Sequence, residues 1–281
     1  MTMRAAILRA PSPLPGFGLS LGITAAMLAA VVLLPIGALL ARGAAIGPGE
    51  VWQAVASERV RAALLLSFRA ALIASLFNVL FGVLLAWVLA RYRFPGRRLI
   101  DAAVDLPFAL PTAVAGIALT ALYAPNGAFG RILAAWDIRI AYTEAGIWIA
   151  LVFVGLPFVV RTVQPVIDEI DREAEEASAT LGASRLTTLR RVVLPTLTPA
   201  ILTGFALALA RSVGEYGSVI FIAGNLPFET EIAPLLIVIR LEEFDVGGAV
   251  AVALAMLLLS FALLLTINAL QVWSRRRMGD V

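Results

Sequence analysis

The feature that most constrains this chain is a series of long apolar stretches with very few charged residues inside them. A helix needs roughly 20 apolar residues to cross the hydrocarbon core of a bilayer, which is about 30 Å thick. Six stretches reach or approach that length, and the fourth extends to Val166 if Arg161 is included. They cover residues 17–41, 70–90, 106–125, 145–160, 199–224 and 246–273. The sequence therefore predicts an all-α integral membrane protein with six transmembrane helices.

Composition supports a membrane protein and removes several classes of site. The chain is 61% hydrophobic and 15% charged, whereas soluble domains are roughly 45–50% apolar and about 25% charged. It has no Cys and no His, so disulfides, thiolate or imidazole metal sites and His general bases are excluded. No glycine-rich phosphate loop ending in Lys-Ser/Thr occurs, and the arginines form no aromatic-interleaved patch for nucleic acid. If ATP drives this protein, another chain must bind it.

The arginines predict how the chain is oriented, because cytoplasmic loops of membrane proteins carry an excess of basic residues. With the N-terminus inside, the predicted cytoplasmic segments hold 14 of the 22 basic residues and the outer segments hold 6. We therefore expect both termini on the cytoplasmic side of the membrane. A short apolar run after the fifth span, 232–239, is too short to cross and is expected near the outer mouth, covered by protein.

The longest predicted cytoplasmic loop, residues 166–198, is the most polar part of the chain. It begins with acidic residues and becomes basic towards span five, and 173–191 contains no proline and many good helix formers. Gly182 interrupts this stretch, and Pro195 follows it. The loop is expected to form two short helices with a bend at Gly182, and Leu194-Pro195 is expected to stop the helical element before span five.

The same loop carries a spaced motif: Glu176-Ala177-Ser178, then Gly182 three residues later, Val192 after nine more, and Leu194-Pro195. This pattern resembles the EAA loop of the membrane subunits of ABC importers, with Ser178 and Val192 as mild departures. The resemblance implies the type I ABC importer permease fold and a cytoplasmic coupling helix that docks on an ATP-hydrolysing subunit. We call residues 166–198 the coupling loop.

A wider resemblance covers most of the chain from about residue 14. These segments are similar to sulfate/thiosulfate permeases of the CysT type, and they are residues 91–97, 105–116, 157–165, 211–217, 219–225 and 241–245. The resemblance implies import of sulfate and thiosulfate by a transport subunit that is not itself an enzyme. Molybdate and tungstate permeases share the coupling loop and the Gly214-Glu215 region, so they are the alternative.

The resemblance also implies a set of partners. They are two copies of an ATP-binding subunit, a second, paralogous permease subunit and an extracytoplasmic sulfate-binding protein, all working with membrane lipid. This chain is expected to bind no cofactor, since ATP and Mg²⁺ are used by the partner ATPase.

Three polar residues inside predicted spans are candidates for the translocation path. Arg211 and Glu215 lie four residues apart in the fifth span, which places them on one helical face where they can neutralise each other. One interpretation is a structural ion pair, and a second, compatible with the first, is that Arg211 adds positive potential to the anion path while Glu215 moderates it. Asn78 in the second span either bonds to a neighbouring helix or lines the path.

Two other functions are alternatives to an ABC permease. A stand-alone secondary carrier usually has internal repeats and more spans. A membrane-embedded enzyme would need carboxylates such as Asp101 and Asp105, but these are expected to pair with Arg97 and Arg98. The domain division that follows is an N-terminal part (1–60), a permease core (61–273) and a cytoplasmic tail (274–281).

Overall fold

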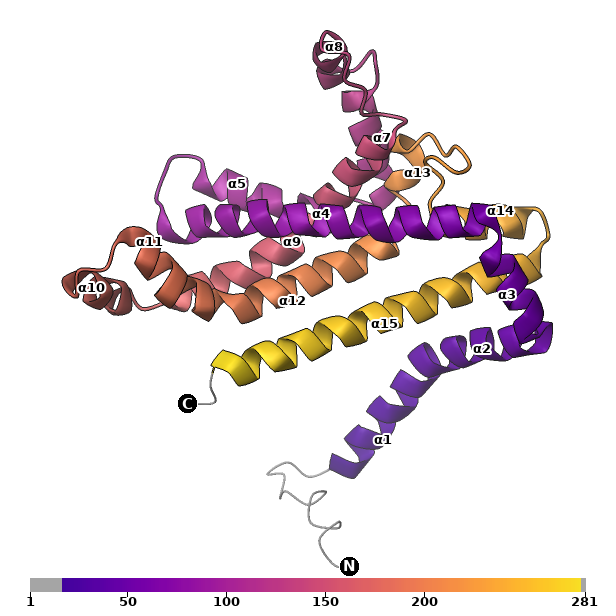
Figure 1. Ribbon diagram of the computed structural model, residues 1–281, viewed down its shortest axis with the longest axis horizontal. Coiled ribbons are helices and arrows are strands. Elements are labelled where there is room, and N and C mark those ends of the chain that lie inside the picture. The colour runs from indigo at the N-terminus through magenta and orange to yellow at the C-terminus, as the bar shows by residue number, and fades with distance from the viewer. Residues whose placement is uncertain (1–16, 279–281) are drawn as a thin grey trace, which may run out of the picture.

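The computed structural model describes residues 17–278, and within this range every regular element is a helix (Figure 1). Residues 1–16 and 279–281 lie outside the described residues, and with them the predicted cytoplasmic Arg4 and Arg9 and the end of the predicted tail. The elements, with η for a π-helical turn, are α1 (Phe17–Leu28), η1 (Ala29–Leu33), α2 (Leu34–Ile46), α3 (Pro48–Ala56), α4 (Glu58–Arg91), α5 (Arg97–Val104), α6 (Leu106–Ala109), α7 (Thr112–Tyr123), α8 (Ala128–Ala134), α9 (Glu144–Glu169), α10 (Arg172–Thr180), α11 (Arg185–Thr188), η2 (Leu189–Val193), α12 (Leu194–Val213), α13 (Val219–Ile222), α14 (Ala233–Glu242) and α15 (Val246–Met278).

Three long helices, α4, α9 and α12, pack side by side and form the centre of the molecule (Figure 1). Small residues let their backbones approach each other. Ala70 and Ala74 of α4 are fully buried, and a Cβ placed on Gly204 of α12 would lie 3.0 Å from the Cα of Val159 in α9. Helices in a bilayer associate mainly through such close packing, because lipid tails are as apolar as the side chains themselves. One cluster of buried apolar residues therefore lies between these three helices, and a separate cluster lies between α4, α14 and α15.

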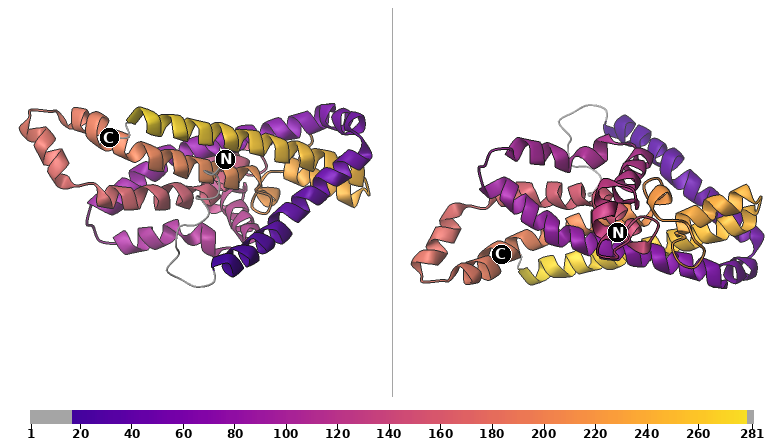
Figure 2. Two further views of the ribbon diagram at one scale, coloured as in Figure 1. Left: turned by 90° about the horizontal axis from the view of Figure 1, so that it is seen from below. Right: turned by 90° about the horizontal axis from the view of Figure 1, so that it is seen from above.

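The first predicted span is one helical segment, Phe17–Ile46, made of α1, η1 and α2. None of its most apolar window is buried, and the segment leaves the bundle (Figure 2). Only the α2 end and α3 pack against α15, where the side chain of Leu254 lies against Gly43. This segment therefore exposes its apolar surface to lipid or to another protein. The predicted start of the permease core at residue 61 lies inside α4 and stays a prediction.

Five helical segments are apolar and long enough to cross a membrane, and the bent pair α7–α8 brings the number to six, within the described residues. The third predicted span, 106–125, is interrupted in the structure. It is divided into α6 and α7 by Leu110 and Pro111, both extended, and α7 is followed by α8 at an angle of 41°. Pro111 has no amide hydrogen, and its ring disfavours helical backbone in the preceding residue, which explains the break.

The fifth predicted span, 199–224, has different ends in the structure. Its helix begins at Arg185, inside the coupling loop, and ends at Val213. The chain then bends through residues 214–218 before the single turn α13. Arg211 therefore lies in the last turn of α12, and Glu215 lies beyond the helix rather than near the middle of a span, which corrects the prediction.

The short apolar run 232–239 forms most of α14, which packs against α4 and α15 as expected of a segment covered by protein. The amide of Ala233 at its start donates to the hydroxyl of Ser67 in α4 at 2.8 Å. Just before it, the buried Glu231 receives two hydrogen bonds from Arg59, at 2.6 and 2.8 Å. These polar contacts fix α14 to the beginning of α4.

The junction between α14 and α15 is fixed by Asp245. Its carboxylate accepts a hydrogen bond of 2.8 Å from the amide of Gly248, in the first turn of α15, and another from Arg240 in α14. The amide hydrogen bond first, and then the arginine, hold the pKa of the Asp245 carboxyl below its usual range despite partial burial. Asp245 therefore stays ionised and caps the longest apolar helix of the second half of the chain.

Candidate coupling loop and translocation site

The coupling loop lies at one end of the long helices, where α10 and α11 project beyond the bundle (Figure 1). Each short helix has a side-chain cap. The carboxylate of Asp171 accepts from the amide of Glu173 at 3.1 Å, and the hydroxyl of Ser184 accepts from the amide of Thr187 at 3.3 Å. Because a cap satisfies an amide left unpaired at the start of a helix, these residues set where α10 and α11 begin.

The bend predicted at Gly182 is confirmed. Gly182 has φ +80°, in the left-handed region, and its amide donates to the carbonyl of Ala179 at 3.0 Å, while Ala183 donates to Ser178 at 3.1 Å. These two bonds close the end of α10 in the way typical of a glycine-terminated helix. Nothing lies within 4 Å of the position of a Cβ on Gly182. Backbone conformation, not space, is therefore what requires glycine here.

The two faces of α10 differ. Glu175 and Ser178 are half-buried towards the rest of the protein, and the hydroxyls of Ser178 and Thr188 lie 2.9 Å apart, joining α10 to α11. Glu176 and Ala177 of the motif are exposed. The side chain of Leu181, next to the bend, is 88% exposed. The outward face therefore presents a carboxylate, small residues and one large apolar side chain.

The expectation that Leu194-Pro195 stops the helix is wrong. The helix runs from Arg185 to Val213, and the π-helical turn η2 lies just before this pair. The amide of Leu194 donates to the carbonyl of Leu189, five residues back. The wider turn absorbs the loss of the amide hydrogen at Pro195, which would otherwise disrupt an α-helix. Val192, half-buried, lies within this turn. The coupling loop is therefore continuous with α12.

Arg211 and Glu215 form the ion pair that the sequence predicts, with 2.5 Å between Nη1 and Oε2. The α-helix ends at Val213, so Glu215 reaches Arg211 from the turn that follows the helix. The other oxygen of Glu215 accepts from the amide and the hydroxyl of Ser218, both at 2.9 Å. The Glu215 side chain is 2% exposed and the Arg211 side chain 34%. The charge accessible from outside is therefore the positive one.

The bend that carries Glu215 packs tightly against α7. A Cβ on Gly217 would overlap the hydroxyl of Thr112, and one on Gly116 would overlap the backbone of Ser218. Two glycines therefore allow the bend and the broken third span to touch. Gly214, in contrast, has open space beside it.

Asn78 lies fully buried on α4, facing α9. With its amide oriented so that both polar atoms are satisfied, the nitrogen donates to the carbonyl of Val152 at 3.1 Å and the oxygen accepts from the amide of Leu156 at 3.2 Å. This geometry favours the inter-helix bond over a role in the path. A buried side-chain amide of this kind fixes how two helices face each other.

Asp101 and Asp105 are paired, but the predicted partners Arg97 and Arg98 are wrong. Both carboxylates bind Arg161 of α9: Asp105 through two hydrogen bonds, at 2.8 and 2.7 Å, and Asp101 through one at 2.6 Å. The sequence does not reveal this contact, because residues 56 and 60 positions apart come together only when α5 packs against α9. Two carboxylates fixed by one guanidinium are ill suited to act as a general acid and base.

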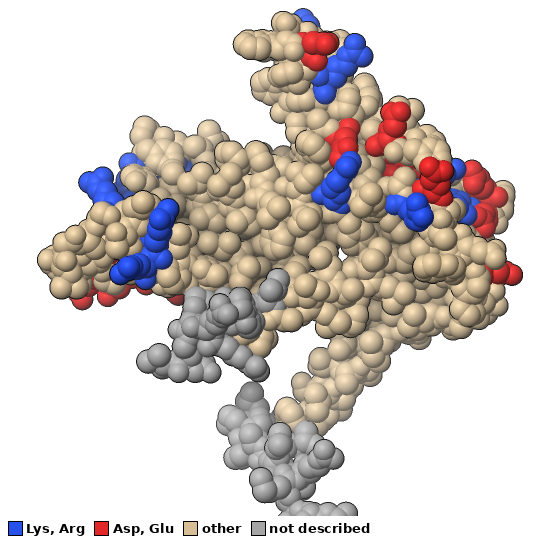
Figure 3. Space-filling view, in the orientation of Figure 1, with Lys and Arg blue, Asp and Glu red and all other residues tan. Residues whose placement is uncertain are grey.

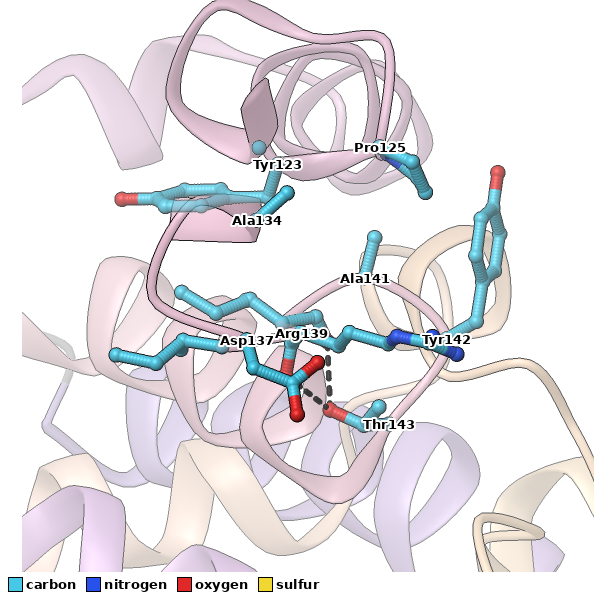
Figure 4. Close-up of a pocket in the computed structure, with 11 residues that line it drawn as sticks. Tyr123, Pro125, Ala134, Asp137, Arg139, Ala141, Tyr142 and Thr143 are labelled. Atoms are coloured by element: carbon cyan, nitrogen blue, oxygen red, sulfur yellow. Dashed lines mark hydrogen bonds between the residues drawn. The ribbon is translucent and has the colours of Figure 1, made fainter. Parts of the chain in front are cut away.

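Charged side chains gather at the end that carries the coupling loop and at the end that carries the α14–α15 junction, with a broad uncharged band beside the coupling loop (Figure 3). A further group lies on the projecting segment around α8. That segment contains a cavity of about 490 Å³ (Figure 4). All its lining residues lie between Tyr123 and Thr143, with Asp137 and Arg139 among them. The cavity is therefore local to the connection from α7 to α9 and is not a passage between the long helices.

Comparison with known proteins agrees with this arrangement. Over 258 residues the chain is 51% identical to the sulfate transport system permease protein CysT of Salmonella typhimurium, covering 92% of this chain and 93% of that protein. It is 50% identical to the Escherichia coli protein of the same name, with the same coverage. Residues 78–280 match the family described as binding-protein-dependent transport system inner membrane component. The chain belongs to the CysT family of these components. As a CysT-family member it is a transport subunit of the inner membrane.

A solved structure supports the fold of this CysT-family chain. A chain from the crystal structure of a bacterial alginate ABC transporter in complex with an alginate pentasaccharide-bound periplasmic protein matches with a TM-score of 0.76. The two share 18% identity over 93% of this chain and 94% of that one. The predicted type I ABC importer permease fold is therefore confirmed.

Proposed function

We propose that this chain is a permease subunit of an ATP-driven importer that moves sulfate, and also thiosulfate, into the cytoplasm. The observation that carries the proposal is identity of about half of all residues to sulfate transport system permeases along 92% of the chain. The partly exposed positive charge of Arg211, beside a buried carboxylate that moderates it, suits passage of a dianion without trapping it. Arg211 and Glu215 are the candidate path residues; Asn78 supports them by fixing α4 against α9.

The coupling loop is proposed to receive the motion of a separate ATPase. Glu176, Ala177 and Gly182 form its outward surface and bend, and Val192, Leu194 and Pro195 carry the motion into α12 through the π-helical turn. ATP and Mg²⁺ are used by two copies of that ATPase, and this chain binds no cofactor.

Two further partners belong to the proposal. A second, paralogous permease subunit would cover apolar surface that the segment Phe17–Ile46 leaves exposed. An extracytoplasmic sulfate-binding protein would deliver the anion to the end of the molecule opposite the coupling loop. In the related alginate transporter a periplasmic protein is bound in the complex.

The proposal places the coupling loop and both termini in the cytoplasm, and this orientation in the membrane is open to a labelling test. The chain has no cysteine, so single cysteines introduced at the exposed Ala179 in α10 and Ala135 after α8 report on one position each. In intact cells a membrane-impermeant maleimide is expected to label only the cysteine replacing Ala135. Labelling of the cysteine at position 179 from outside would reverse the proposed orientation.

The substrate is tested by competition. In liposomes that hold the complete transporter, uptake of labelled sulfate is expected to fall when unlabelled sulfate or thiosulfate is present in tenfold excess, and to change little with molybdate or tungstate. Inhibition by molybdate with no effect of thiosulfate would assign the transporter to the alternative anion class.

A further inference from the structure

The coupling helix α10 needs an attachment besides its chain connections. It has only nine residues, and a helix of that length is marginal in isolation. It is joined to α9 by the extended Ile170 and to α11 by the bend at Gly182. An element held only at such joints would absorb a displacement by rotating. The side chains that touch α10 therefore decide how much of a displacement reaches the membrane helices.

One side chain connects α10 directly to a long membrane helix. Arg91, the last residue of α4, donates from Nη2 to a carboxylate oxygen of Glu175 in α10 at 2.7 Å. The same nitrogen lies 3.3 Å from the carbonyl of Ile170, at the end of α9. Arg91 therefore links α4, α9 and α10 at one point.

The surroundings of Arg91 hold its guanidinium in place. The side chain is 13% exposed, and its central carbon lies 5.4 Å from the centre of the Trp87 ring, one turn earlier on α4. A cation over an aromatic ring is stabilised by the ring's charge distribution. Arg91 also lies at the C-terminal end of α4, where the helix dipole favours a positive charge. An ion pair made by an arginine that is buried and oriented in this way holds its partner more firmly than a fully exposed surface pair, whose contribution to stability is usually small.

We propose that Arg91 is a positioning residue that fastens the coupling helix to α4 through Glu175. A displacement of α10 then moves α4, which packs against α9, α12 and α14, in addition to the movement that passes along the chain into α12. The coupling loop thus acts on two membrane helices at once. This inference rests on the proposed function, since it assumes that an ATPase displaces α10.

The contact itself is tested without substrate or partner. In the full chain in lipid nanodiscs, amides of residues 173–181 are expected to exchange with deuterium about tenfold faster in Glu175→Gln and in Arg91→Gln, because hydrogen bonds to charged groups are the stronger ones. Glu173→Gln is the matched control, since Glu173 lies on the same helix, is exposed and makes no side-chain hydrogen bond or ion pair within the described residues. Equal exchange in Glu175→Gln and Glu173→Gln would overturn the proposal.

The positioning role is tested in the reconstituted complex by the number of sulfate ions imported per ATP hydrolysed. We expect this ratio to fall at least about fivefold in Glu175→Gln and in Arg91→Gln, and to stay much closer to wild type in Arg91→Lys, which keeps the positive charge that pairs with Glu175. Faster exchange with an unchanged ratio would overturn the positioning role. A wild-type complex without ATP-dependent uptake would contradict the proposed function instead, while the exchange result would still report on the contact.

Discussion

Replacing Gly182 by proline is expected to reduce ATP-dependent uptake at least about tenfold while the chain still inserts into the membrane. Gly182 has φ +80°, and the proline ring fixes φ near −65°. Proline also lacks the amide that donates to Ala179. The bend between α10 and α11 therefore cannot keep its shape, and α10 no longer presents its outward face correctly. Uptake of labelled sulfate into liposomes containing the complete transporter measures the effect.

Gly182→Asn is the control at the same position. Asparagine adopts the left-handed conformation more readily than most residues with a side chain, keeps its amide hydrogen, and finds open space here. We expect it to retain most of the uptake. Equal loss in Gly182→Asn and Gly182→Pro would mean that the outward surface at this position, and not the bend, is what the ATPase needs. Normal uptake in Gly182→Pro would contradict the account of the coupling loop.

Removing the charge of Arg211 is expected to have the second large effect. Arg211→Gln leaves the nearly fully buried Glu215 without its cationic partner. Breaking such a pair from one side costs about 3–5 kcal/mol in buried settings, and less here because Arg211 is partly exposed. We therefore expect less folded protein in the membrane as well as lower uptake. Thermal unfolding in detergent and uptake per inserted chain separate these two effects.

The double variant Arg211→Gln with Glu215→Gln separates structure from transport. It removes both charges and leaves side chains that can still form hydrogen bonds, so we expect the stability to recover. Uptake of sulfate per inserted chain is expected to stay at least about tenfold below wild type, because a dianion near one positive charge gains several kcal/mol where water is partly excluded. Arg211→Lys, which keeps the charge, should transport better than the double variant. Full uptake in the double variant would reduce the pair to a structural role.

Much of the fold follows from local properties of the sequence. Length and hydropathy are sufficient to predict α4 and the apolar helix α15, and the bend at Gly182 follows from a glycine between two helix-forming stretches. The end of the fifth span's helix at Val213 does not follow from the sequence. Hydropathy averages over about 20 residues and does not register where an apolar segment bends, because buried bends are as apolar as helices.

The polar contacts were harder to predict because their partners are distant in sequence. The pair of Arg211 and Glu215 is predictable because its members are four residues apart, although the local structure differs from the expected helix. The contacts of Arg161 with Asp105 and of Arg91 with Glu175 span 56 and 84 residues. Nearby arginines offered equally plausible partners in the sequence, and only the packing of the helices selects between them.

The most direct test of the central claim is sulfate uptake by liposomes that contain this chain together with its ATPase, its partner permease and a sulfate-binding protein. The account predicts uptake that needs ATP and the binding protein together and that stops when either is omitted. Sulfate uptake by this chain alone, unaffected by ATP, would contradict the account and identify a stand-alone carrier.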